Sequence, residues 1–473
     1  MRVLYFAPKE CWPTTTGARL RNYHLARVLA QSARLTYLAF SDDVAARQEG
    51  KRNSRDGRKS TSETEESQPA RRAGRSLVST NGDGPAPWCE RVILVPQGPI
   101  YTPMKLARGA LGRVPVTVLN YTSRAMAAKL KSLLDADDFD VVQVESVQLA
   151  AYLPIIRAAR NNPLVICDWH NIESDLMRQY SKRTSNVLRQ IYSRRTAFQL
   201  EAMECRVAQE ADANVMCSEP DRARLLDLVP GARAFVIENG VDVGFYTDEV
   251  IDRAYAAWRE HKAGDARLDP ESTAAKDHEP LRQRVLFVGS MDYHANIDGA
   301  VHFARSVWPQ VLRLLPNLTL TIVGRNPAPE VRKLADLKGI EVTGTVEDVR
   351  PYYREALASV VPLNVGGGSR LKICEGMAAG IPIISTRLGA EGVDANDGEN
   401  IIFAETADEF CEAIKHVAAE QGKWQDLVTG GRRLVSDKYD WSILGEHLGA
   451  IHRALLRERD ERGNGRLASA RAS

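Results

Sequence analysis

The sequence is poor in several features that mark familiar functional classes. It contains no apolar run of about 18 residues, so we expect no transmembrane helix. Its seven cysteines are scattered and form no Cys-x-x-Cys pair, a pattern typical of reduced thiols in the core of a cytoplasmic protein. The formal net charge is only +2, which argues against a nucleic-acid-binding protein.

Residues 42–88 have little that could form a core. Their central part, 47–75, contains no aromatic residue and carries nine Lys or Arg against five Asp or Glu. Such a segment cannot bury enough apolar surface to offset the entropy lost on ordering, so we predict a disordered insertion. The positive excess could contact anionic lipid or polymer, but a solvated loop is the preferred interpretation.

The rest of the chain has an ordinary globular composition, with 44% hydrophobic and 26% charged residues. Its 473 residues are too many for one compact core, so about two or three domains are expected. The apolar run at its start is too short for a signal peptide and predicts a first strand. We therefore expect a cytoplasmic protein, with peripheral contact to the inner face of a membrane as an option.

Strands and helices alternate in both halves. A strand at 2–6, a helix at 18–31 and a strand at 34–40 form a β-α-β unit, which implies a parallel sheet. The second half restarts with a strand at Arg284 and repeats this alternation. The predicted division is a Rossmann-like domain at 1–240 that contains the insertion, a linker at 241–282, a second domain at 283–438, and a C-terminal helix and tail at 439–473.

The most informative stretch follows a buried strand in the second half. It reads V-P-L-N-V-G-G-G-S-R-L-K-I-C-E-G-M-A-A-G-I-P-I-I-S-T and runs from Val361 to Thr386. A strand, a glycine turn and a helix at 370–379 together predict an anion site, because free N–H groups point out of the first helical turn. The third glycine of G-x-G-x-x-G is missing, and no G-K-[ST] of a Walker loop follows.

Side chains within this stretch fit a nucleotide. Glycines 366–368 would let the backbone approach a phosphate, and Arg370 and Lys372 could neutralise its charge. Glu375 could accept two hydrogen bonds from a ribose diol. The alternative is a glycine-rich turn whose charged residues are merely solvated.

Two further candidates lie beyond the carboxyl ends of strands in the first half, where parallel sheets bind ligands. Gly17 opens the first helix, beside Arg19. His170 follows the strand at 164–168, in D-W-H-N-I-E-S, and is the best candidate in this half for a group near the chemistry. A solvated helix start and a structural histidine are the respective alternatives.

Residues 100–117 mix apolar and basic side chains. Met104 and Leu111 alternate with Lys105, Arg108 and Arg113. This pattern suits a mobile acceptor loop or an interfacial membrane contact, and an ordinary surface helix fits it equally well.

The chain resembles glycosyltransferase family 4. The motifs that carry the resemblance are V-G-S-M, I-V-G-R, V-T-G-T-V-E-D-V and the stretch from Val361 to Thr386, together with N-G-V-D between the halves. The resemblance implies an α/β protein of the GT-B fold, with two doubly wound Rossmann-like domains facing a cleft and a C-terminal helix returning to the first. The first half is similar to a subgroup linked to bacterial exopolysaccharide and exosortase systems.

The resemblance also implies roles for individual residues. Glu375 matches the ribose-binding Glu of an E-x7-E motif, whereas the first Glu of that motif is replaced by Gly367. The family's Arg and Lys after the first strand of the second domain are absent. The implied donor-binding residues are Gly17, Gly289, Arg325, Gly366, Gly367, Gly368, Ser369 and Glu375, and the implied catalytic residues are His170, Arg370 and Lys372.

The expected reaction is retaining transfer of a sugar from a nucleotide-sugar donor to a glycan or lipid-linked acceptor. The cations of the glycine-rich stretch would stabilise the leaving diphosphate, so neither a metal nor a cofactor is expected. A nucleotide-sugar 2-epimerase on the same fold is one alternative. A non-catalytic nucleotide-sugar-binding protein is another.

Overall fold

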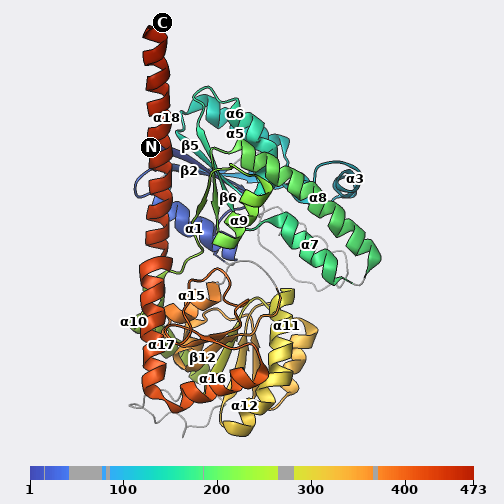
Figure 1. The fold of residues 1–473 in the computed structure, drawn as a ribbon, viewed down its shortest axis with the longest axis vertical. Coiled ribbons are helices and arrows are strands. Elements are labelled where there is room, and N and C mark those ends of the chain that lie inside the picture. The colour runs from blue at the N-terminus through green and yellow to red at the C-terminus, as the bar shows by residue number, and fades with distance from the viewer. Residues whose placement is uncertain are drawn as a thin grey trace, which may run out of the picture. The chain divides into compact units, whose positions relative to one another are not determined.

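The computed structural model describes residues 1–14, 16–41, 77–80, 86–184, 186–264, 282–365 and 371–472. The chain forms two compact units, one made of Met1–Glu238 with Leu444–Ser473 and the other of Asn239–Ile443. Each unit has a predominantly parallel sheet with helices packed around it (Figure 1). The predicted doubly wound α/β architecture is thus confirmed. No helix in the described ranges is long and apolar enough to cross a membrane.

The first unit is built on an eight-stranded sheet in the order β3-β4-β2-β1-β5-β6-β7-β8. Its strands are β1 (Arg2–Ala7), β2 (Arg34–Ser41), β3 (Leu77–Thr80), β4 (Arg91–Pro96), β5 (Val141–Glu145), β6 (Leu164–Trp169), β7 (Ala213–Met216) and β8 (Ala234–Val236). Only β3 runs antiparallel to its neighbour, β4. The strand order reverses between β1 and β5, since β1 pairs with β2 on one side and β5 on the other.

The helices of this unit are α1 (Gly17–Leu29), α3 (Pro103–Leu111), α4 (Val116–Tyr121), α5 (Arg124–Ala136), η1 (Val147–Tyr152), α6 (Leu153–Arg157), α7 (Glu173–Arg183), α8 (Val187–Glu210) and α9 (Glu219–Leu228). Helix α1 begins where the Thr16 hydroxyl accepts a hydrogen bond from Arg19 N, at 3.3 Å. It buries Leu25, Val28 and Leu29, the apolar face that its sequence spacing predicts.

The C-terminal helix α18 (Trp441–Ala472) returns to the first unit, as the resemblance implied. A Cβ atom on Gly445 would lie 2.4 Å from Val28 Cβ, so the absence of a side chain lets α18 approach α1 closely. Arg233 adds a two-pronged ion pair to Glu458, with both N–O distances at 2.7 Å.

One end of the predicted disordered insertion is ordered, which corrects that prediction. Leu77–Thr80 forms β3 and pairs with residues 91–94 of β4, and Ala86 is buried. The apolar and β-branched residues of this short segment suit a strand, but they follow a long polar run that dominated the sequence interpretation. Residues 42–76 and 81–85 lie outside the described residues.

The second unit has a six-stranded parallel sheet in the order β11-β10-β9-β12-β13-β14. Its strands are β9 (Arg284–Val288), β10 (Thr319–Val323), β11 (Ile340–Gly344), β12 (Ala356–Val361), β13 (Ile383–Ser385) and β14 (Ile402–Phe403). Here the order reverses between β9 and β12. A ligand crevice is expected outside the carboxyl ends of strands at such a reversal.

Helices pack around this sheet to form one apolar core. They are η2 (Val243–Tyr246), α10 (Asp248–Gly264), α11 (His294–His302), η4 (Phe303–Val307), α12 (Trp308–Leu314), α13 (Pro329–Arg332), η5 (Lys333–Asp336), α14 (Arg350–Arg354), α15 (Leu371–Ala378), α16 (Ala407–Ala419), α17 (Gln421–Leu434) and η6 (Val435–Tyr439). Helix α10 lies in the predicted linker, yet it packs on the second unit, where Tyr255 Oη donates to Glu355 Oε1 at 2.8 Å.

Candidate functional site

The predicted donor-site residues of the second unit gather at its sheet reversal. Gly289 follows β9, Arg325 follows β10, and Lys372 and Glu375 lie on α15, the helix that comes after β12. All four therefore belong to the carboxyl edge of the parallel strands. The remaining predicted residues, Gly366, Gly367, Gly368, Ser369 and Arg370, lie outside the described residues.

Lys372 extends from the first turn of α15 to the end of β9. Its Nζ donates to Asn296 Oδ1 at 2.6 Å, and Asn296 Nδ2 donates to the carbonyl of Ser290 at 2.9 Å. A Cβ atom on Gly289 would lie 2.9 Å from both Lys372 Nζ and Asn296 Nδ2. Glycine at 289 therefore leaves room for the ammonium group. The loop after β9 has no Lys or Arg of its own up to Asn296, and α15 supplies a lysine.

Arg325 is held at the same edge by the β9 loop. Its Nε donates to Ser290 Oγ at 2.8 Å, and Ser290 Oγ donates to Asp292 Oδ1 at 2.7 Å. The hydrogen bond from Ser290 is the main cause that lowers the pKa of Asp292, so this carboxylate stays ionised and balances part of the positive charge.

Glu375 is the most unusual titratable group in this unit. Burial raises the pKa of its carboxyl group to about 7, and the nearby Lys372 ammonium limits the rise. The negative charge of Glu375 adds to the burial that raises the pKa of Tyr246 and Tyr353. Within the described part of the chain, its carboxyl group has neither a hydrogen bond nor an ion pair. A half-buried carboxyl without partners can accept hydrogen bonds from a ligand.

His170 lies at the carboxyl edge of the first unit's sheet, directly after β6. Its side chain is 16% exposed, and its Nε2 is 3.5 Å from Glu145 Oε2 at the end of β5. Glu145 is fully buried and accepts a hydrogen bond from Gln143 Nε2 at 2.8 Å. The Asn22 amide, with its nitrogen turned toward Glu145, adds a second at 2.9 Å. The carboxylate of Glu145 is thus held in place beside a partly exposed imidazole.

A buried ion pair lies below this histidine, and the sequence analysis did not find it. Arg21 Nη2 and Asp168 Oδ1 are 3.0 Å apart, and both side chains are fully buried. Burial raises the pKa of Asp168 to about 6, against the opposing charge of Arg21. Asp168 therefore faces the core and not a crevice. The available signal was spacing, because Arg21 lies four residues before Leu25 on the apolar face of α1.

Gly17 is the first residue of α1, which follows β1. The amino end of this helix therefore lies at the same sheet edge as His170, because β1 and β6 run in the same direction. No acidic residue occupies its first turn, so nothing there opposes an approaching anion.

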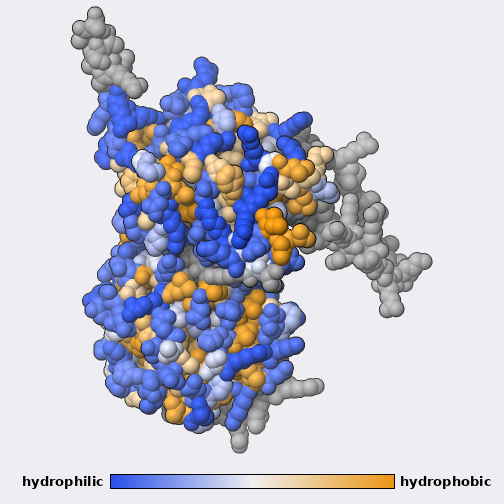
Figure 2. All heavy atoms as spheres, turned by 45° about the vertical axis from the view of Figure 1, so that its right-hand side comes forward, coloured by the Kyte–Doolittle hydropathy of each residue, from blue (hydrophilic) through white to orange (hydrophobic). Residues whose placement is uncertain are grey.

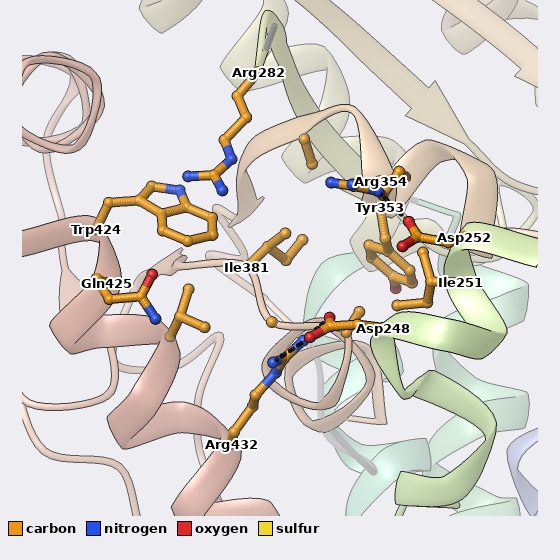
Figure 3. Close-up of a pocket in the computed structure, with 14 residues that line it drawn as sticks. Asp248, Ile251, Asp252, Arg282, Tyr353, Arg354, Ile381, Trp424, Gln425 and Arg432 are labelled. Atoms are coloured by element: carbon orange, nitrogen blue, oxygen red, sulfur yellow. Dashed lines mark hydrogen bonds and ion pairs between the residues drawn. The ribbon is translucent and has the colours of Figure 1, made fainter. Parts of the chain in front are cut away.

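A cavity of about 340 Å³ lies at the opposite edge of the second unit's sheet, near the starts of β12 and β13. Arg432 pairs with Asp248 there, and the Arg282 guanidinium lies 3.4 Å from the centre of the Trp424 ring (Figure 3). None of the predicted site residues lines this cavity. We interpret it as a gap between α10, α14 and α17.

Two family models match the chain. The model described as Glycosyltransferase Family 4 matches residues 89–245, and the one described as Glycosyl transferases group 1 matches residues 282–420. One curated relative is an uncharacterised 44.6 kDa protein in the cps region of Klebsiella pneumoniae. It is 26% identical over 164 residues, which are 33% of this chain and 42% of that protein. The match thus spans less than half of the relative.

Solved structures share the architecture over nearly the whole chain. Sucrose-phosphate synthase from Thermosynechococcus elongatus has a TM-score of 0.63 at 16% identity and covers 97% of this chain and 100% of its own. HepE from Anabaena, in complex with UDP, has a TM-score of 0.59 at 13% identity. The match covers 96% of this chain and 100% of HepE. A glycosyltransferase from Rickettsia africae has a TM-score of 0.58 at 12% identity, with 96% and 98% covered.

At these identities the solved structures establish the fold alone, and the two family models add the family. The chain is a glycosyltransferase of the GT-B fold, with a Glycosyltransferase Family 4 domain followed by a Glycosyl transferases group 1 domain.

Proposed function

We propose that this protein is a retaining glycosyltransferase that moves a sugar from a nucleotide-sugar donor to a glycan or lipid-linked acceptor in exopolysaccharide or cell-surface glycan biosynthesis. The observation that carries the proposal is Glu375, a half-buried carboxyl with no protein partner in the described chain, one helical turn from Lys372 at the sheet reversal. The HepE complexes with UDP and with UDP-glucose support the donor class. The relative in a cps region supports the pathway class.

The second unit would hold the nucleotide. The Lys372 ammonium and the amino end of α15, where the helix dipole is positive, would bind the diphosphate. Glu375, about one turn further along, would accept hydrogen bonds from the ribose hydroxyls. Arg325 would add charge from the next strand. Arg370 and glycines 366–368 stay predicted members of this site.

Transfer breaks the bond between the anomeric carbon and a diphosphate oxygen. Negative charge develops on the leaving diphosphate, and Lys372 would stabilise it more strongly as the bond breaks. The acceptor hydroxyl oxygen then bonds to the anomeric carbon, and its proton can pass to the departing diphosphate. His170, beside Glu145, is proposed to contact the reacting sugar.

No metal or cofactor is part of this proposal. Among the described residues, no group of three or more His, Cys, Asp or Glu side chains is arranged to hold a metal ion. The expectation that fixed cations replace a metal stays a prediction.

The test is a screen of nucleotide sugars by thermal shift, followed by turnover assays with and without glycan and lipid-linked acceptors. Lys372→Ala and Glu375→Ala should each weaken donor binding about tenfold or more, since charge-assisted hydrogen bonds are lost. Lys415→Ala and Glu412→Ala are matched controls, because this exposed pair on α16 has the same three-residue spacing. The proposal fails if the two pairs of variants behave alike.

The products separate the remaining alternatives. Transfer with the anomeric configuration of the donor supports the proposal. A nucleotide sugar epimerised at C2 without acceptor would indicate the epimerase instead, and tight binding without turnover on any acceptor would indicate a binding protein.

A further inference from the structure

Large apolar side chains are strongly exposed on two helices of the first unit, α3 and the amino-terminal half of α8. The exposed fractions are 72% for Met104, 86% for Leu111, 65% for Val187, 78% for Leu188, 60% for Ile191 and 73% for Phe198. Single exposed apolar residues are ordinary on protein surfaces, but a gathering of this kind marks an interaction site.

The two helices form one surface, which we call the α3–α8 face. Gln199 Nε2 of α8 donates to the carbonyls of Gly109 and Gly112 at 2.8 Å each, and Arg195 Nη2 donates to the carbonyl of Gly112 at 2.9 Å. These bonds tie the end of α3 to the side of α8. Figure 2, which turns this side of the molecule forward, shows hydrophobic side chains lying among hydrophilic ones.

The charge on this face has one sign. Residues 100–117 and 187–198 contain no Asp or Glu. Their cations are Lys105, Arg108, Arg113, Arg189, Arg194 and Arg195. Lys105 Nζ donates to the Pro99 carbonyl at 2.8 Å, and none of the six is paired with a carboxylate within the described ranges.

Exposed apolar side chains together with cations of one sign favour one class of partner, an anionic membrane. A second copy of the chain would bring six further cations against these six, and an uncharged apolar partner would leave them without counter-charge. A bilayer with anionic headgroups accepts both parts of the face, because apolar side chains enter the boundary of the acyl chains while Lys and Arg contact phosphates. We propose that the α3–α8 face docks this protein on an anionic lipid membrane.

The α3–α8 face lies near the sheet edge that carries the candidate site residues of the first unit. Helix α3 follows β4 and α7 follows β6, so both leave the carboxyl edge of the sheet. Helix α8 begins directly after α7 and packs along it (Figure 1). Gly17 and His170 lie at the same edge. A bilayer against this face would present membrane-borne acceptors to that edge. The inference does not depend on the sugar-transfer reaction, because binding to lipid can be measured without a donor.

The experiment is co-sedimentation of the full chain with phosphatidylcholine vesicles, with and without phosphatidylglycerol, at low and high salt. We expect binding only to the anionic vesicles, with loss at high salt because surface charge is screened. Arg189→Gln with Arg194→Gln should lower the partition coefficient by about fivefold per charge removed. Leu188→Gln with Phe198→Gln should lower it as well.

Matched controls come from the second unit. Arg305→Gln with Arg313→Gln removes two exposed cations, and Leu314→Gln removes an apolar side chain that is 51% exposed. These variants should bind anionic vesicles as the wild type does. The proposal is overturned if no vesicle binds, if neutral and anionic vesicles bind equally, or if the controls lose as much. It is also overturned if light scattering shows a dimer that Leu188→Gln dissociates. Donor binding, measured separately, should not change in any variant.

Discussion

Glu375 is a carboxyl group whose protonated and ionised forms are both well populated near neutral pH. Its pKa of about 7 arises from burial that only Lys372 opposes. Ribose hydroxyls can donate hydrogen bonds to the ionised form, so a bound nucleotide should lower this pKa and release a proton. The protonation state of one residue thus becomes a sensitive reporter of the proposed site.

We predict that donor affinity rises with pH. Between pH 6 and pH 8 it should increase by up to about tenfold, because the ligand selects the ionised carboxylate of a group with a pKa near 7. Titration calorimetry with a nucleotide sugar measures this directly, since its diphosphate does not titrate in that range. Glu375→Gln should flatten the profile. A wild-type profile that is already flat would remove Glu375 from the donor site.

Gly289→Ala should weaken donor binding without unfolding the protein. The new Cβ would lie 2.9 Å from Lys372 Nζ, so the ammonium group must move away from the end of β9. Because a flexible side chain can yield, we expect a small change in Tm but a loss of donor affinity of about tenfold. Gly422→Ala is the control, since its Cβ would meet nothing within 4 Å. Unchanged affinity in Gly289→Ala would show that Lys372 does not contact the phosphates.

The sequence indicated part of this site and could not indicate the rest. Lys372 and Glu375 could be predicted from the sequence because they follow a glycine-rich turn at helical spacing. The hydrogen-bond partner of Lys372 could not be predicted, because Asn296 lies 76 positions away and only the fold brings the two side chains together. The raised pKa of Glu375 was equally hidden, since burial is a property of the folded chain.

At the scale of elements, a buried ion pair joins α1 to β6. The side chains of Arg21 and Asp168 contact each other and are fully shielded from solvent. Arg21 Nη1 also donates a hydrogen bond to the Glu238 carbonyl at 2.8 Å. Burying two charges costs desolvation free energy, which offsets much of their attraction. Removing one partner is more destabilising still, because it leaves the other buried without a counter-charge.

We therefore predict that Arg21→Met costs about 3–5 kcal/mol of unfolding free energy. The double variant Arg21→Met with Asp168→Leu should be more stable than this single variant, because Asp168 is no longer left buried without its counter-charge. Urea unfolding of the wild type, of each single variant and of the double variant measures the difference. If the two substitutions simply add, the pair does not act as a unit.

Helix α18 carries a second buried group that responds to pH. His452 is fully buried, and burial lowers the pKa of its imidazole to about 3. Neither ring nitrogen has a hydrogen-bond partner in the described chain. The folded protein therefore holds the neutral form, so stability is complete above the unfolded-state pKa of about 6.5 and falls as the pH drops toward about 3.

At pH 5 this histidine should cost about 2 kcal/mol relative to pH 7.5. His452→Leu should remove that part of the acid sensitivity, as read from Tm at the two pH values. His447→Leu, at an exposed position on the same helix, should leave it in place. Equal acid sensitivity of all three proteins would contradict this account of α18.

Most elements could be predicted from their apolar runs, since parallel strands such as β6 and β12 are buried along their whole length and are mostly apolar. Helix α10 was harder to place. Its helical pattern was visible, but its packing on the second unit depends on contacts such as Tyr255 with Glu355, which are remote in sequence. Strand β3 was missed because four residues beside a long polar segment carry too little signal.

At the scale of the whole molecule, the two units share an architecture but differ in the side chains at their candidate sites. The second has Lys372, Arg325 and the Glu375 carboxyl near its sheet reversal, whereas the first has a histidine at its sheet edge and an exposed apolar and basic face. Family and fold follow from the whole chain. The sugar, the base and the acceptor depend on a few side chains that sequence patterns do not encode.

The most direct test of the central claim is a crystal structure of the full chain with a nucleoside diphosphate, UDP being the first choice. The account predicts ribose hydroxyls within hydrogen-bond distance of the Glu375 carboxylate and phosphate oxygens beside Lys372 Nζ and Gly289. A nucleotide bound elsewhere, with Glu375 still lacking a ligand, would contradict it.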